Sequence, residues 1–144
     1  MGNRAVIAFG KSSDSVNLKQ TFGIYLHWNG GRESVQGFLY ATKELMKQAG
    51  RGPDGQYGPA RLVQIIGNFL GGALSLGLGP LCELDCDNGD NGTFVVDPET
   101  MEIVGRLHKC GERGFNKEYC QKVRDQAIEN SRNIFCPPSE SKAA

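Results

Sequence analysis

The sequence lacks the motifs that identify several large classes of enzyme. It contains no Gly-x-Ser-x-Gly, no His-Glu-x-x-His and no phosphate-loop motif, and it has only two histidines, His27 and His108. The usual signatures of serine hydrolases, zinc proteases and phosphate-loop NTPases are therefore missing. We expect a binding protein rather than an enzyme, although the sequence leaves a Cys–His pair open.

The sequence also lacks an excess of charge of either sign. Lys and Arg together number 16, as do Asp and Glu, so the formal net charge is zero. A chain without a basic field is not expected to hold a nucleic-acid polymer. A small anionic ligand needs only a few local cations, so neutrality does not argue against such a ligand.

The five cysteines do not form the pattern of a disulfide framework. Their number is odd, no two form Cys-x-x-Cys, and no secretory signal is recognisable before them. We therefore expect reduced thiols in a cytoplasmic protein without a cofactor or a bound metal. A zinc site is the open alternative. It would use Cys82, Cys86, His108 and Cys110.

No hydrophobic run has the character of a membrane span. Leu62–Cys82 carries no charge and is about long enough to cross a bilayer, but it contains Gln64, Asn68, Pro80 and several glycines. Its apolar pattern changes partway from helical spacing to alternation. We interpret this run as a buried helix followed by a buried strand, and we expect no membrane partner.

The remaining patterns predict an α+β fold, in which a small antiparallel β-sheet packs with helices and a long helix lies near the C-terminus. Alternating apolar residues indicate strands, and apolar residues at helical spacing indicate helices. The predicted strands are Arg4–Phe9, Thr21–Trp28, Leu74–Leu78, Thr93–Val96 and Glu102–Leu107, and the predicted helices are Arg32–Ala49, Pro59–Leu70 and Asn116–Ile134. We expect one domain over residues 1–136 and a disordered tail over residues 137–144.

The last predicted helix has a narrow apolar stripe. It consists of Tyr119, Val123, Ala127 and Ile134. Such a stripe either docks the helix on its own domain or packs it against another subunit, and the sequence leaves both alternatives open.

The junction after the second predicted strand has the composition of a ligand site. Here the only tryptophan, Trp28, is followed by Asn29, two glycines and Arg32. A flat ring, an amide, accessible backbone N–H groups and a guanidinium suit a phosphorylated or nucleotide-like ligand. A lone tryptophan is more often a core or interface residue, so its exposure decides between the two interpretations.

A polar stripe interrupts the apolar surface of the second predicted helix. Arg61, Gln64 and Asn68 share one face by their spacing, and one arrangement open to this face is to lie opposite the predicted hairpin that carries Arg106. The stripe is either the solvent-exposed face of an otherwise buried helix or part of a phosphate-binding site.

The loop Asp85–Gly92 is dense in Asp, Asn and Gly but does not match a calcium loop. Counted from Asp85, Gly89 and Asp90 fall where a ligand and a glycine are required, and Val96 falls where a glutamate is required. The loop is either a tight turn or a surface from which Asn88 and Asn91 contact a ligand. An enzyme that uses the Asp85–Asp90 carboxylates with a divalent metal is the alternative function.

Four motifs together resemble the first phage Thoeris anti-defence family, whose members are sponge proteins. They are Asn-Arg-Ala-Val-Ile at Asn3–Ile7, Gly-Ile-Tyr-Leu-His-Trp-Asn-Gly-Gly at Gly23–Gly31, Arg-Leu-Val-Gln-Ile-Ile-Gly-Asn-Phe at Arg61–Phe69, and Leu-Asp-Cys-Asp-Asn-Gly-Asp-Asn-Gly at Leu84–Gly92. The resemblance extends roughly from Asn3 to Leu107.

This resemblance implies a protein that sequesters cyclic ADP-ribose isomers, and in some members cyclic oligonucleotides, without cleaving them. It implies an antiparallel sheet joined to helices, a homodimer or a higher homo-oligomer, and residence in the cytoplasm of an infected bacterium. An aromatic residue, an asparagine and arginines line the family's pocket. The matching positions here are Arg61, Asn88 or Asn91, and Arg106, with Trp28 and Phe69 competing as the stacking aromatic.

Overall fold

The computed structural model describes residues 3–71, 75–109 and 114–135, and side chains as far as residue 132. The described elements agree closely with the predicted segments. In chain order they are β1 (Ala5–Phe9), β2 (Phe22–Leu26), α1 (Arg32–Gln48), α2 (Tyr57–Leu70), β3 (Leu76–Pro80), β4 (Thr93–Asp97), β5 (Glu102–Leu107) and α3 (Lys117–Phe135), with short 3-10 helices at Ser13–Ser15 and Leu81–Glu83. The tail predicted over residues 137–144 lies outside the described residues.

The five strands form one mixed sheet in the order β3-β2-β1-β4-β5. The predicted pairing of the first two strands is confirmed, because β1 and β2 are antiparallel. The α+β class is also confirmed, but β1 and β4 are parallel, so the sheet is not wholly antiparallel. A parallel pair needs a long crossover connection, and here the chain passes through both α1 and α2 before it returns as β4.

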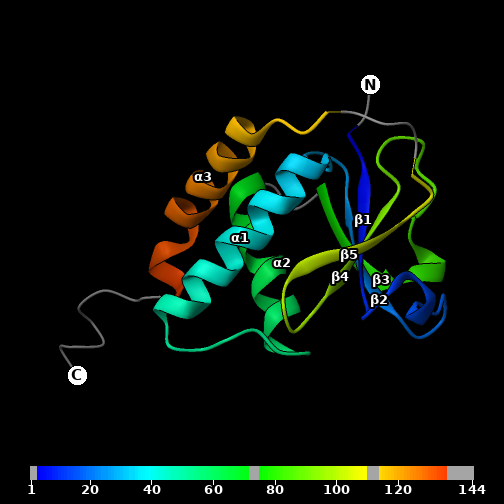
Figure 1. Ribbon diagram of the computed structural model, residues 1–144, viewed down its shortest axis with the longest axis horizontal. Helices are drawn as coiled ribbons and strands as arrows, with labels where there is room; N and C mark the ends of the chain where they lie inside the picture. The colour runs from blue at the N-terminus through cyan, green and yellow to red at the C-terminus, as the bar shows by residue number, and fades with distance from the viewer. Residues whose placement is uncertain (1–2, 72–74, 110–113, 136–144) are drawn as a thin grey trace.

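The helices cover one face of this sheet (Figure 1). The predicted apolar stripe of α1 is confirmed, since all of its members are buried. They are Val35, Phe38, Leu39, Leu45 and Met46. The hydrophobic cluster on the opposite face of the sheet is smaller. There, Leu81 together with Val16 and Leu84 packs on Val6 and Ala8. The uncharged run Leu62–Cys82 contains most of α2 and all of β3, as the sequence predicts.

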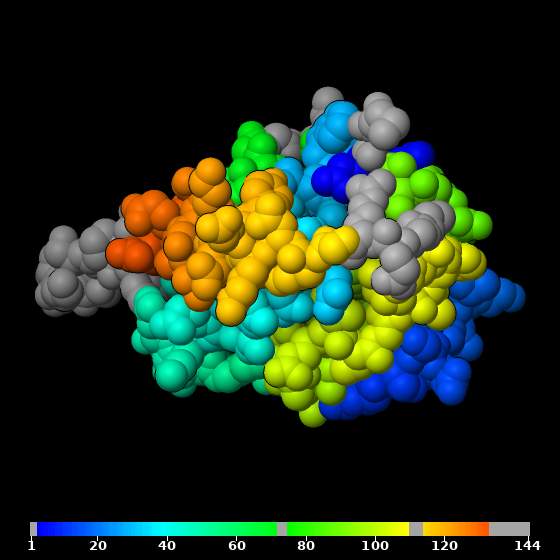
Figure 2. Space-filling model, turned by 45° about the horizontal axis from the view of Figure 1, so that its top comes forward, coloured from blue at the N-terminus to red at the C-terminus, as the bar shows by residue number. Residues whose placement is uncertain are grey.

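The long helix α3 docks on its own domain, where it lies over α1 (Figure 2). A side chain at Gly37 of α1 would place its Cβ within 2.9 Å of both the Cys120 carbonyl oxygen and a methyl group of Val123. Both Val123 and Ala127 are consequently part of the main hydrophobic core. The missing side chain at Gly37 therefore allows α1 and α3 to approach closely.

We predict that Gly37→Ala destabilises the fold even though alanine is the better helix former. The added methyl group would have to displace backbone and a packed valine, and such overpacking costs about 1–3 kcal/mol. Urea denaturation followed by circular dichroism measures the change in the free energy of unfolding.

Gly67→Ala in α2 is the matched control, because the nearest atom to its new Cβ would be a Leu76 methyl group at an ordinary 3.7 Å. It should gain about 0.5–1 kcal/mol from helix propensity. Equal effects of the two substitutions would contradict the close approach of α1 and α3.

Candidate ligand-binding site

The junction between β2 and α1 is held tightly against the start of β1. The Gly30 N–H donates to the Asn3 carbonyl oxygen at 2.8 Å. A Cβ at Gly30 would lie 2.6 Å from that oxygen and 2.7 Å from the Ala5 Cβ, so only glycine fits. Asn29 adopts a left-handed backbone with φ of 57°, a conformation that asparagine tolerates better than most residues. The chain therefore turns sharply here and leaves the Trp28 ring on the surface, 46% exposed.

Residues at the start of α3 and just before it contact this junction. The Asn29 side-chain amide donates to the Tyr119 hydroxyl at 3.3 Å and to the Ser34 hydroxyl at 3.2 Å. The Arg32 guanidinium lies 5.1 Å from the centre of the Phe115 ring. Phe115 and Tyr119 are 40% and 43% exposed. The junction surface, as we call Trp28, Asn29, Arg32, Phe115 and Tyr119, thus combines exposed aromatic rings, an amide and a guanidinium.

The first turn of α1 contributes positive potential to the junction surface. Gly31 is the N-cap and supplies no side-chain cap, so the first N–H groups of α1 have no partner within the helix. The helix dipole and these N–H groups favour an anion. One carboxylate is nearby, but Glu33 accepts the Asn116 N–H at 2.9 Å. Arg32 forms no salt bridge within the described part of the chain.

Asn88 organises the loop Asp85–Gly92, which we call the acidic loop, through hydrogen bonds within the loop. Its side-chain nitrogen donates to the carbonyl oxygens of Asp85 and Gly92, each at 3.1 Å. Its side-chain oxygen accepts the N–H groups of Asp90, Asn91 and Gly92 at 3.0–3.1 Å. The side chain is buried, and its hydrogen bonds are used inside the loop. This geometry favours the tight-turn interpretation over direct contact between Asn88 and a ligand.

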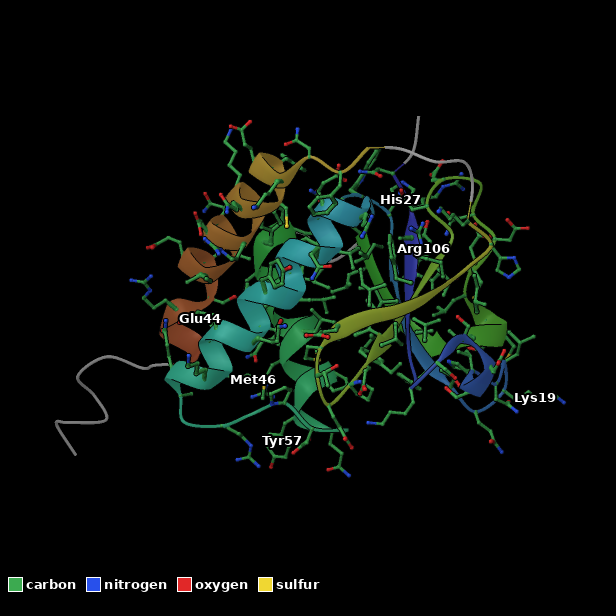
Figure 3. All side chains as sticks on the ribbon, in the orientation of Figure 1. Lys19, His27, Glu44, Met46, Tyr57 and Arg106 are labelled. Carbon is green, nitrogen blue, oxygen red and sulfur yellow. The ribbon has the colours of Figure 1, made fainter. Side chains whose placement is uncertain are left out.

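Asn91 and Arg106 connect this loop to the junction. The Asn91 amide donates to the Asn3 side-chain oxygen at 2.8 Å, and Asn3 also accepts the Gly30 N–H. The Arg106 guanidinium donates to the Asn91 carbonyl oxygen at 2.7 Å and stacks 4.0 Å from the Phe94 ring centre. Figure 3 shows the labelled His27 and Arg106 toward the same end of the sheet. Asn91 and Arg106 therefore support the backbone of the junction and do not line its exposed surface.

The carboxylates of the acidic loop are dispersed among different partners. Asp90 accepts the Arg4 guanidinium Nε at 2.7 Å, and Asp85 lies 3.7 Å from the same guanidinium. Asp87 lies 3.9 Å from His108. Over residues 3–71, 75–109 and 114–132, no three Asp, Glu, His or Cys side chains come together as a metal site. Cys110, which the zinc alternative requires, lies outside the described residues.

The polar stripe of α2 lies apart from the junction surface and contacts α3 through Asn68. The Asn68 amide donates to the Ser131 hydroxyl at 3.1 Å. Two buried atoms of the stripe, Arg61 Nε and Gln64 Oε1, have no hydrogen-bond partner in the described structure. Phe69 packs edge-on against Phe38 at a centroid distance of 5.1 Å, so it serves the core. Of the two aromatic residues that competed as the stacking ring, Trp28 is the exposed one.

The structure thus divides the ten predicted site residues into two groups. Trp28, Asn29, Arg32, Asn88, Asn91 and Arg106 lie at one end of the sheet, whereas Arg61, Gln64, Asn68 and Phe69 lie on α2. Sequence reasoning missed Phe115 and assigned Tyr119 only to an apolar stripe. No local pattern links these two residues to Asn29 and Arg32, because their proximity depends on how α3 docks.

Comparison with models of known protein families, with curated proteins and with solved structures finds no match to this chain. Among the described helices, none is both long enough and apolar enough to span a lipid bilayer. The fold and the junction surface therefore define an α+β domain with an exposed aromatic and cationic surface patch, and the assignment of a function rests on that patch.

We predict that Asn88→Ala destabilises the fold. The substitution leaves buried backbone N–H and C=O groups without partners, which costs about 2–3 kcal/mol in the free energy of unfolding measured by urea denaturation. Asn17→Ala is the control, because Asn17 caps an exposed turn through Lys19 and Gln20, and it should cost less than about 1 kcal/mol. A similar small loss at Asn88 would show that the loop is not organised by this side chain.

We also predict a pH dependence that originates at Asp90. The hydrogen bond from the Arg4 guanidinium holds the pKa of the Asp90 carboxyl below its usual value. Because the folded-state pKa is lower than the unfolded one, this stabilisation is present above the ordinary carboxyl pKa and is lost as the pH falls below it. Urea denaturation across the acidic range should show a weaker pH dependence for Asp90→Asn than for Asp14→Asn. Identical profiles would contradict the assignment.

Proposed function

We propose that this protein is a phage-encoded anti-defence sponge, which binds a cyclic ADP-ribose isomer or a cyclic oligonucleotide and holds it without cleavage. The observation that carries the proposal is the junction surface at the uncapped start of α1. Here Trp28 is exposed, Tyr119 contacts Asn29, and Phe115 contacts Arg32. The choice of ligand rests on the resemblance of four sequence motifs to the Thoeris anti-defence family.

Each part of such a ligand has a matching group at the junction surface. A purine ring stacks on an exposed aromatic side chain, and each such contact is worth about 1–3 kcal/mol. A pyrophosphate pairs with the Arg32 guanidinium and with the N–H groups at the start of α1. The Asn29 amide is placed at the same surface, where it can read a ribose or base edge.

Capture without cleavage agrees with the groups at this surface. The Glu33 carboxylate is engaged by the Asn116 N–H, and the nearby His27 Nδ1 lies 3.1 Å from the Tyr25 hydroxyl. The alternative of a metal-dependent phosphoesterase relies on the acidic loop, where Asp90 is already paired with Arg4. The geometry of the described residues therefore favours binding.

The proposed setting follows the family resemblance. Cyclic ADP-ribose signals would be met in the cytoplasm of the infected bacterium, and the sponge would act there as a homodimer or a higher homo-oligomer. Arg61 and Gln64 are part of this proposal as a second region, because a ligand or a neighbouring subunit would supply the partners that their buried atoms lack.

Isothermal titration with cyclic ADP-ribose isomers tests the proposal. We expect saturable binding, and chromatography of the ligand released by heat should return it unchanged. Arg32→Ala should weaken binding about tenfold to a hundredfold, because it removes a charge-assisted contact to phosphate. A hydrolysed product, or no binding to any isomer or cyclic oligonucleotide, would overturn the proposal.

Arg51→Ala is the matched control. Arg51 is also an exposed arginine that stacks on an exposed aromatic ring, with its guanidinium 3.7 Å from the Tyr57 ring centre. It lies in the loop between α1 and α2, away from the junction surface, so its removal should leave the affinity unchanged. Equal losses in the two variants would assign the effect to overall charge instead of the site.

A further inference from the structure

The edge strand β3 has little protection against pairing with another strand. In the described structure it pairs with β2 alone. Natural edge strands are commonly protected by charged residues, bulges or covering segments. The other edge strand, β5, carries Glu102 and Arg106. Its pairing with β4 also contains a register shift. By contrast, the segment Gly71–Leu81 contains no charged residue, and Leu78 within it is 53% exposed.

The pairing of β3 with β2 determines which backbone groups remain available. Hydrogen bonds from His27 N–H to the Ser75 carbonyl and from Leu81 N–H to the Thr21 carbonyl, both at 3.0 Å, mark two bonded positions of the ladder. Bonded and non-bonded positions alternate along an antiparallel pair. The N–H and C=O groups at positions 76 and 78 therefore point away from β2, toward the open side of the sheet.

The proline at the end of β3 agrees with this assignment. Pro80 occupies the same outward register as residues 76 and 78, where its missing N–H removes nothing from the ladder with β2. The outward edge thus offers complete N–H and C=O pairs at two leucines and ends at the proline.

An apolar hollow between the sheet and α2 reaches this edge strand at Leu78. It has a volume of about 320 Å³, and its lining includes Phe9, Phe22, Ile24, Pro59, Val63 and Leu78. Phe22 is 56% exposed, so both it and Leu78 present large apolar surface to solvent. A strand added beside β3 would satisfy the backbone and cover Leu78 in the same step.

We propose that β3 pairs with β3 of a second copy of this chain, antiparallel and with the two-fold axis at Gly77. In this register Leu76 of each copy faces Leu78 of the other, and each such pair exchanges both of its N–H···O=C bonds. A register centred on Leu78 is poorer, because it would place Leu76 opposite Pro80, which has no N–H to donate.

The second copy is the occupant that the observations favour over a foreign strand. A self-pairing strand must match itself, and the uncharged segment brings no like charges together at a two-fold axis. Gly77 meets its own copy at a non-bonded position, where Cα atoms approach most closely, and it has no side chain to obstruct them. The leucines on either side then form cross-strand apolar pairs on the face that carries the helices.

This inference names a surface for the homo-oligomer in the proposed function, yet it rests on the β3 edge alone. Its test needs no ligand. Loss of self-association and loss of nucleotide binding are therefore separate results, and either can occur without the other.

Sedimentation equilibrium across the micromolar range measures the assembly. We expect the wild-type chain to dimerise. Leu78→Lys should lose the dimer, because it places like charges at the contact between the two β3 strands. Val104→Lys should keep the dimer. Val104 is the matched control, since it is an exposed aliphatic residue, 41% exposed, on the opposite edge strand. A monomeric wild-type chain, or a Leu78→Lys dimer as stable as the wild type, would overturn the proposal.

Cysteine cross-linking tests the register itself. A Cβ at Gly77 would meet only the Tyr25 Cβ, at 3.8 Å, so Gly77→Cys should fold. Opposed non-bonded positions lie about 4.5 Å apart between Cα atoms, within the range that a disulfide spans. Mild oxidation should give a covalent dimer in Gly77→Cys, beyond any wild-type background, but not in Leu78→Cys. The reverse preference, or no cross-link in either variant, would refute the register.

Discussion

The close contact between α1 and α3 at Gly37 is the constraint on which the candidate site depends. Without a side chain there, the Cys120 carbonyl and Val123 come up against α1 and set the position of α3 along it. This alignment brings the start of α3 beside the start of α1. The rings that contact Asn29 and Arg32 therefore come from a segment that only helix packing places there.

Hydrogen bonds, rather than apolar burial, support the other side of the site. Asn88 ties the acidic loop to itself, Asn91 links that loop to Asn3, and Asn3 holds Gly30 at the junction. The amides that looked available for a ligand in the sequence are thus used to position the backbone. Recognition is therefore left to the exposed rings, Arg32 and the Asn29 amide, and the acidic loop has a supporting role.

Sequence patterns predicted the local features of this fold well, because these features follow from the spacing of neighbouring residues. The buried stripe of α1 and the pairing of β1 with β2 are examples. Contacts between distant segments were not predictable in this way. The parallel placement of β4 and the approach of Tyr119 to Asn29 depend on connections and packing across the whole chain. The stripe at Arg61 and Gln64 was visible in the sequence, but the burial of Arg61 Nε and Gln64 Oε1 without partners was not.

Fluorescence of the single tryptophan tests the central claim most directly, because Trp28 is the only such residue and lies within the junction surface. Titration with a cyclic ADP-ribose isomer that binds by calorimetry should change the Trp28 emission saturably, with the same midpoint as the heat signal. A purine stacked on or beside the ring is the physical reason. Binding that leaves the Trp28 emission unchanged would contradict the account and move the site elsewhere, first to the stripe around Arg61.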